Sequence, residues 1–147
     1  MQLSTFTDYA LRVLMHLAVA PDSKLTTRQI ADIHDAKYNH LTKVIQWLVN
    51  EGYVTSTRGR SGGLQLQRKA TEINVGLVIR DLESRQSLVE CMRSDGGACN
   101  LAGACVLTNA LLEAEEAFFR VLDGKTLSEL TLRGEKISVL LKRLNNG

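Results

Sequence analysis

Apolar residues at helical spacing, with hardly a break, constrain the fold of this 147-residue chain more than any other feature. They recur every three or four positions over most of the sequence, and the only proline is Pro21. Hydrophobic residues make up 44% and charged residues 23%, which is ordinary for a globular protein that can bury a core. The sequence therefore predicts a mainly α fold with little sheet. Its length fits one compact domain, or a small head with an appendage.

Three helices are predicted within the first 50 residues. The first has Thr5 or Thr7 available as its N-cap and ends before the proline. A second, short helix begins at the capping-box pair Thr26 and Gln29, an arrangement in which each side chain can bond the backbone N–H of the other residue. The third carries its apolar residues on one face, and Asn39 is its expected N-cap.

A β-hairpin is predicted directly after the third helix. Residues 53–58 are rich in β-branched and aromatic side chains, and residues 64–67 alternate apolar and polar. Between them lies a glycine-rich, basic turn, residues 59–63. Three helices and such a hairpin predict a winged helix-turn-helix: a mainly α fold with a small β-hairpin wing.

The polar residues of this unit suit DNA binding. In a winged helix the second helix of the helix-turn-helix enters the major groove, and the wing follows the backbone or enters the minor groove. Residues 1–70 hold nine Lys/Arg against five Asp/Glu, so this half is basic although the whole chain carries only +2. The alternative is a solvated polar face or a protein-binding surface. The candidate DNA-binding residues are Thr27, Arg28, Tyr38, Asn39, His40, Thr42, Lys43, Arg58, Arg60, Ser61 and Gly62.

Three cysteines gather in the second half of the chain, in a segment without helical periodicity. Cys91, Cys99 and Cys105 place three soft ligands in a glycine-containing loop that leads into a helix. A helix N-terminus lowers the pKa of a thiol, and a flexible loop can wrap an object larger than one ion, so an iron-sulfur cluster fits. Zinc and unrelated buried thiols remain alternatives. The three histidines form no recognisable nucleophile arrangement with these cysteines, so no catalytic residue and no enzyme activity are predicted.

Residues 106–122 form the longest apolar stripe, with Gly124 as the expected helix stop. Such a helix usually buries its stripe against a second copy, which predicts a homodimer; packing within the chain is the alternative. We therefore divide the chain into a winged-helix DNA-binding domain (1–83), a cysteine-containing cluster loop (84–105), and a dimerisation helix with a C-terminal tail (106–147). A frayed helix is expected over residues 137–144.

The cellular location of the protein is predicted from its most apolar segment and from its cysteines. The most apolar early stretch, residues 10–20, includes Arg12 and His16 and is shorter than the roughly 18 residues that span a bilayer. No membrane segment and no export signal are expected. Because an odd number of cysteines without an export signal argues against a disulfide framework, we expect a reducing, cytoplasmic setting.

Several local motifs together carry a family resemblance. These are the opening Met1-Gln2-Leu3-Ser4-Thr5-Phe6-Thr7-Asp8-Tyr9-Ala10-Leu11-Arg12, the segment Gly52-Tyr53-Val54, the pairs Arg58-Gly59 and Gly62-Gly63, and three cysteines ahead of a long helix. With them the whole chain resembles the Rrf-type (IscR/NsrR) winged-helix regulators, and its opening is most similar to the NsrR-like, nitric-oxide-sensing members.

The resemblance implies a cofactor and its ligands. In NsrR-like proteins three cysteines and an aspartate of the opening hold a 4Fe-4S cluster, and Asp8 stands at that position. IscR-like members bind a 2Fe-2S cluster with a histidine soon after the third cysteine, where this chain has Val106, Leu107 and Thr108. The gap of seven residues between Cys91 and Cys99 is longer than is usual in the family. From the sequence alone, Asp8 would be a helix-start residue facing the first-turn N–H groups.

The function implied is a homodimeric transcriptional repressor that binds an operator in double-stranded DNA and senses nitric oxide, with nitrosylation weakening DNA binding. An IscR-like iron-sulfur or redox-responsive regulator is the alternative within the family. A zinc or thiol-based interaction protein without DNA function is the alternative outside it.

Overall fold

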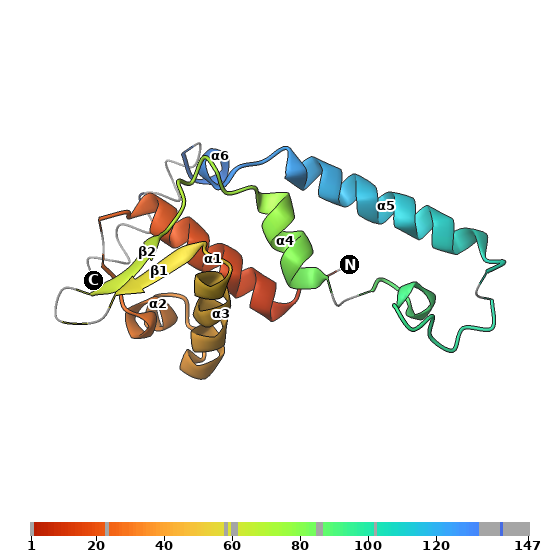
Figure 1. Cartoon of the computed structure of the whole chain (residues 1–147), viewed down its shortest axis with the longest axis horizontal. Helices are drawn as coiled ribbons and strands as arrows, with labels where there is room; N and C mark the ends of the chain where they lie inside the picture. The colour runs from red at the N-terminus through yellow and green to blue at the C-terminus, as the bar shows by residue number, and fades with distance from the viewer. Residues whose placement is uncertain are drawn as a thin grey trace.

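The computed structural model describes residues 2–22, 24–57, 59, 62–84, 87–101, 103–132 and 139. In chain order the elements are α1 (Thr5–Val19), α2 (Thr27–Ile33), α3 (Tyr38–Asn50), β1 (Val54–Thr57), β2 (Gly63–Leu66), α4 (Val75–Glu83), a 3-10 turn η1 (Glu90–Met92), α5 (Val106–Asp123) and α6 (Leu127–Leu132). Figure 1 shows α1 to α4, the two strands and α6 gathered into one body, from which α5 extends with its C-terminal end next to α4. The predicted mainly α fold with one β-hairpin is confirmed. In the described part of the chain, no helix is long and apolar enough to cross a membrane.

The core of this body forms around α1. Several of its side chains are at most 1% exposed: Leu14 and Leu17 of α1, Leu48 of α3, Ile73 just before α4, and Leu127 of α6. A fully buried leucine or isoleucine contributes about 1.5–3 kcal/mol to stability. This shared core fixes the helices that carry the candidate DNA-binding residues.

The helix starts agree only partly with the sequence-based prediction. Ser4, not Thr5 or Thr7, caps α1, and its Oγ accepts a hydrogen bond from Thr7 N at 3.1 Å. The predicted capping box at the start of α2 is confirmed. The expected cap of α3 by Asn39 is wrong, because α3 already begins at Tyr38, after a Lys37 that makes no side-chain cap.

The wing is an antiparallel hairpin in which Val54 pairs with Leu66 and Thr57 with Gly63. Gly63 lies so close to the chain before α2 that an added Cβ would be 2.5 Å from the Lys24 carbonyl carbon. Next to it, Leu64 N donates to Leu25 O at 2.9 Å, so the wing is attached to the helical body. The wing residues Arg58, Arg60 and Ser61 lie outside the described residues.

The C-terminal part contains one helix that the sequence analysis missed. Gly124 follows α5 as predicted, but with φ −78° rather than in the left-handed region. The chain then turns into α6, which packs on α1. Thr126 and Glu129 cap it reciprocally: Thr126 N donates to Glu129 Oε2 at 2.9 Å and Glu129 N to Thr126 Oγ1 at 3.3 Å. The helix expected over residues 137–144 lies outside the described residues except for Val139.

Candidate nucleic-acid interface and metal centre

A basic hollow forms where the start of α2 meets the start of α3. It has a volume of about 630 Å³, and its lining residues are Arg28, Lys37, Tyr38, Asn39, His40 and Lys43. Three of these carry a positive charge and none carries a negative charge. Such a surface favours an anionic partner such as the DNA backbone.

Arg28 and Tyr38 contact each other across this hollow. The guanidinium carbon of Arg28 lies 3.9 Å from the centre of the Tyr38 ring. This stacking, typical of arginine, holds the cation over the start of α3, where it can bind an anionic group.

The remaining described DNA-binding candidates lie around the hollow. Thr27 opens α2, and Thr42 is exposed on α3 with its hydroxyl donating to Tyr38 O at 2.9 Å. His40 is half-buried, and its ring centre lies 5.4 Å from that of Tyr9 in α1. Gly62 lies at the wing, where its N–H donates to Gly59 O at 3.0 Å.

Lys37 is a residue that the sequence analysis missed. It stands in the turn between α2 and α3, a position assigned only to the turn itself. In a helix-turn-helix, phosphate contacts commonly come from residues that flank the second helix, so a cation directly before α3 was the available signal.

Two of the three cysteines line a second, smaller cavity. Cys91 of η1 and Cys105 at the start of α5 share a hollow of about 230 Å³, which is also lined by Gly103, Ala104, Val106, Thr108 and Asn109. Cys91 Sγ lies 3.4 Å from Thr108 Oγ1. Two thiols that are 14 positions apart in the sequence therefore line one cavity at the start of α5.

The start of α5 favours the thiolate of Cys105. This residue is the N-cap, so its sulfur faces the unpaired N–H groups of the first turn. The nearby backbone N–H groups of Thr108 and Leu107, and then the Thr108 hydroxyl, lower the pKa of the Cys105 thiol. A thiolate is the form that binds soft metals.

Cys99 does not line this cavity, but the loop folds back toward it. Gly97 has φ +58°, and an added Cβ would lie 2.6 Å from Glu90 O. The next residue, Ala98, donates its N–H to Glu90 Oε1 at 3.2 Å. The loop thus returns Cys99 to the neighbourhood of the turn that carries Cys91.

Asp8 lies on α1 and pairs with Arg12. Arg12 Nη2 lies 2.8 Å from Asp8 Oδ2, and Arg12 Nε donates to Asp8 Oδ1 at 3.0 Å. Asp8 does not line the cavity of the two thiols. Among the residues that the structure describes, no three Cys, His, Asp or Glu side chains are grouped closely enough to hold a metal ion.

The helix-turn-helix, its wing and the basic hollow define a winged-helix DNA-binding protein. A family model described as "Rrf2: Iron-dependent Transcriptional regulator" matches residues 3–133. The chain belongs to the Rrf2 family and is a transcriptional regulator, not an enzyme.

Individual relatives agree with this assignment. The "HTH-type transcriptional regulator NsrR" of Halalkalibacterium halodurans is 41% identical over 143 residues, which are 97% of this chain and 98% of the relative. The crystal structure of Staphylococcus aureus CymR in its oxidized form is similar with a TM-score of 0.69 and 27% identity, over 89% of this chain and 96% of that chain. T. potens IscR has the same fold, with a TM-score of 0.73 and 24% identity over 93% and 90% of the two chains.

Proposed function

We propose that this protein is a transcriptional repressor that senses nitric oxide through an iron-sulfur cluster. The observation that carries the proposal is the cavity at the start of α5, which is lined by both Cys91 and Cys105 and where the pKa of the Cys105 thiol is lowered. Its support is the 41% identity to a regulator named NsrR.

The proposed cluster ligands are Cys91, Cys99, Cys105 and Asp8. Three thiols in one loop fit iron, and a cluster held there supplies iron that reacts with nitric oxide. A carboxylate oxygen holds iron less firmly than a thiolate does, so Asp8 is the weakest of the four ligands. We favour 4Fe-4S over 2Fe-2S, because no histidine follows Cys105 in the sequence.

Within one chain, Asp8 lies away from the cavity of the two thiols and pairs with Arg12. We therefore infer that Asp8 reaches the cysteines of a second copy, and that its carboxylate would there bind iron in place of its ion pair with Arg12. This exchange ties the DNA-binding body of one subunit to the cluster loop of the other.

The proposed dimer uses α5. None of its side chains is buried within one chain, and Val106 and Val121 are 81% and 66% exposed. An apolar helix of this kind gains stability when a partner covers it. Of the predicted dimerisation part, residues 106–147, α5 is then the interface, whereas α6 packs on α1 within the DNA-binding body. Residues 84–105 are the proposed cluster loop and residues 1–83 the proposed DNA-binding domain, in a protein of the cytoplasm.

The proposed DNA contacts are the eleven residues named from the sequence, with Lys37 added. The two recognition helices of a dimer fit half-sites about one DNA turn apart. We infer that ligation by Asp8 sets the spacing of the two DNA-binding bodies. Loss of this ligation would change the spacing, so the bodies would no longer match the half-sites and nitric oxide would lower the affinity for DNA.

Anaerobic purification followed by iron and sulfide analysis tests the proposal. We expect a coloured protein with about four iron and four sulfide per chain, and loss of both in Cys91→Ser. Two iron per chain without any effect of nitric oxide would favour the IscR-like alternative. Zinc without sulfide would favour an interaction protein.

Arg28→Ala separates the two parts of the proposal. It should weaken DNA binding and make it less dependent on salt, since one phosphate contact is lost. The iron content should stay that of the unaltered protein. Loss of iron in this variant would contradict the assignment of Arg28 to DNA alone.

A further inference from the structure

The C-terminal end of α5 is joined to the start of α4 mainly through the backbone. Asn74, the N-cap of α4, donates Nδ2 to Asp123 O at 2.6 Å, and Val75 N donates to Lys125 O at 2.9 Å. Gly76 lets the two helices approach, since an added Cβ would lie 2.6 Å from Asp123 N. These contacts meet at one end of α5 and form a pivot, which by itself does not fix the direction of the helix.

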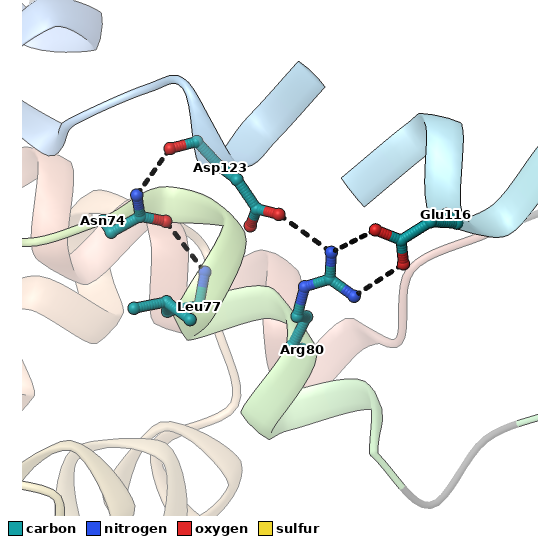
Figure 2. Close-up of polar contacts among 5 residues, drawn as sticks. All are labelled: Asn74, Leu77, Arg80, Glu116 and Asp123. Carbon is teal, nitrogen blue, oxygen red and sulfur yellow. Dashed lines mark hydrogen bonds and ion pairs between the residues drawn. The ribbon is translucent and has the colours of Figure 1, made fainter. Parts of the chain in front are cut away.

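Arg80 reaches from α4 to α5 beyond this pivot, as Figure 2 shows. Its Nη2 donates to Asp123 Oδ2 at 2.8 Å, and Nη1 donates to Glu116 Oε2 at 3.4 Å. Its guanidinium carbon also lies 4.3 Å from the ring centre of Phe119. Because residues 116, 119 and 123 share one face of a helix, a single side chain holds α5 over two turns.

Among the residues that the structure describes, no other α4 side chain beyond the pivot makes a hydrogen bond or ion pair with α5. No α5 side chain is buried within the chain, and a cavity of about 420 Å³ lies beside the joint, lined by Leu3, Arg80, Glu83, Phe118 and Phe119 among others. An apolar core does not fill this side. The direction of α5 therefore depends on the polar contacts of Arg80.

Asp123 depends on Arg80 in turn. Its Oδ1 is buried and, among the described residues, has no hydrogen-bond partner, so Oδ2 carries the bond that compensates its charge. Replacing Arg80 by a neutral side chain would leave this carboxylate without its cation at the pivot.

The other end of α4 is fastened to α1. Glu83 Oε1 accepts hydrogen bonds from Ser4 N at 2.9 Å and from the Thr7 hydroxyl. Thr7 is the neighbour of Asp8. Thus α4 connects the long helix, through Arg80, to the segment that carries the proposed cluster ligand.

We propose that Arg80 is a positioning residue that sets the direction of α5 relative to the DNA-binding body. It thereby sets the separation of the two DNA-binding bodies in the dimer. The inference rests on the proposed function only in that two bodies bind one duplex; it needs neither the cluster nor nitric oxide.

The first test compares DNA duplexes. The probes are a duplex that the full-length unaltered protein selects from a random library, the same duplex cut to one half-site, and versions with the spacer lengthened or shortened by one base pair. For Arg80→Gln we expect at least tenfold weaker binding to the selected duplex, unchanged binding to the half-site, and a weaker dependence on spacer length. Glu116→Gln, which keeps the Asp123 contact, should show a smaller effect of the same kind.

Arg120→Gln is the matched control, because it removes the same charge from an exposed position of α5. A general loss of charge or of folding would weaken binding to the half-site as well, or would affect Arg120→Gln equally. Either result, or an unchanged spacer dependence in Arg80→Gln, would overturn the proposal.

A second test does not require DNA. Spin labels on non-natural residues at the exposed positions Gln46 and Glu113, in protein diluted with unlabelled chains, report the distance between the DNA-binding body and α5. Arg80→Gln should broaden this distance distribution, whereas Arg120→Gln should not. An unchanged width would overturn the role of Arg80 even if the proposed function holds, and a broadened one would support it even if no operator is found.

Discussion

The three cysteines differ most in how their thiols are surrounded. Cys105 faces the N–H groups at the start of α5, which lower the pKa of its thiol, whereas Cys99 stands in the loop before the helix. Because the thiolate is the nucleophile, the metal-free protein should react with iodoacetamide several-fold faster at Cys105 than at Cys99 near pH 7. Peptide mass spectrometry measures both rates. Thr108→Val should slow the reaction of Cys105; equal rates at the two thiols would contradict this account of the helix terminus.

A buried histidine pair predicts a pH dependence of stability. His16 of α1 is fully buried, and its Nδ1 lies 3.1 Å from His34 Nε2 at the end of α2. Burial, helped by His16 and Arg12 and opposed by Asp8, lowers the pKa of His34 from 6.5 to about 4. The unfolded chain therefore binds the proton first as the pH falls from 6.5 towards 4, and the free energy of unfolding drops over that window.

We expect this drop to be about 1–2 kcal/mol, because solvent screens a half-buried imidazole. Urea unfolding at several pH values measures it. In His34→Gln the drop should be smaller by that amount, since the side chain no longer titrates. Identical pH profiles of the two proteins would show that the histidine pair does not contribute.

At the scale of the elements, the joint between α4 and α5 leaves no room for a side chain at Gly76. In Gly76→Ala the new Cβ would meet Asp123 backbone atoms at 2.6 and 2.8 Å, so the helices must separate. We expect a loss of about 1–3 kcal/mol in thermal or chemical unfolding. Gly124→Ala is the control, because Gly124 has φ −78° and its added Cβ would meet only Val121 O at 3.6 Å. Equal effects of the two variants would contradict the close approach.

Local signals account for most of the elements that the sequence predicted. The α2 capping box, the amphipathic α3 and the stop at Gly124 depend on residues within four positions of one another, so they are visible in the sequence. The same kind of signal, Thr126 with Glu129, marks α6 and was overlooked. The contacts of Arg80 with Glu116 and Asp123 span 36 and 43 positions, and only the folded chain brings them together.

The candidate sites divide in the same way. Five predicted DNA-binding residues line one hollow because they come from two helix starts that the helix-turn-helix places side by side. Three cysteines within one loop could be recognised from their spacing. That the proposed ligands are only partly grouped could not be predicted. The position of Cys99 depends on how the loop folds, and ligation by Asp8 depends on the proposed second copy.

For the whole molecule, the exposed face of α5 predicts a dimer. Leu112 is 47% exposed on this helix, and a charge there would be buried without a partner if α5 covers a second copy. Sedimentation should show two chains for the unaltered protein and one for Leu112→Glu. Glu113→Gln, at the next and already polar position, should stay dimeric. A monomeric unaltered protein would contradict the use of α5 as an interface.

The central claim is that one protein couples an iron-sulfur cluster to DNA binding, and a single titration tests it most directly. Anaerobic protein is mixed with its fluorescently labelled operator, and nitric oxide is added stepwise while visible absorbance and DNA anisotropy are recorded together. The account predicts that the cluster absorbance and the bound DNA are lost over the same range of added nitric oxide. Loss of the absorbance while the DNA stays bound would contradict it.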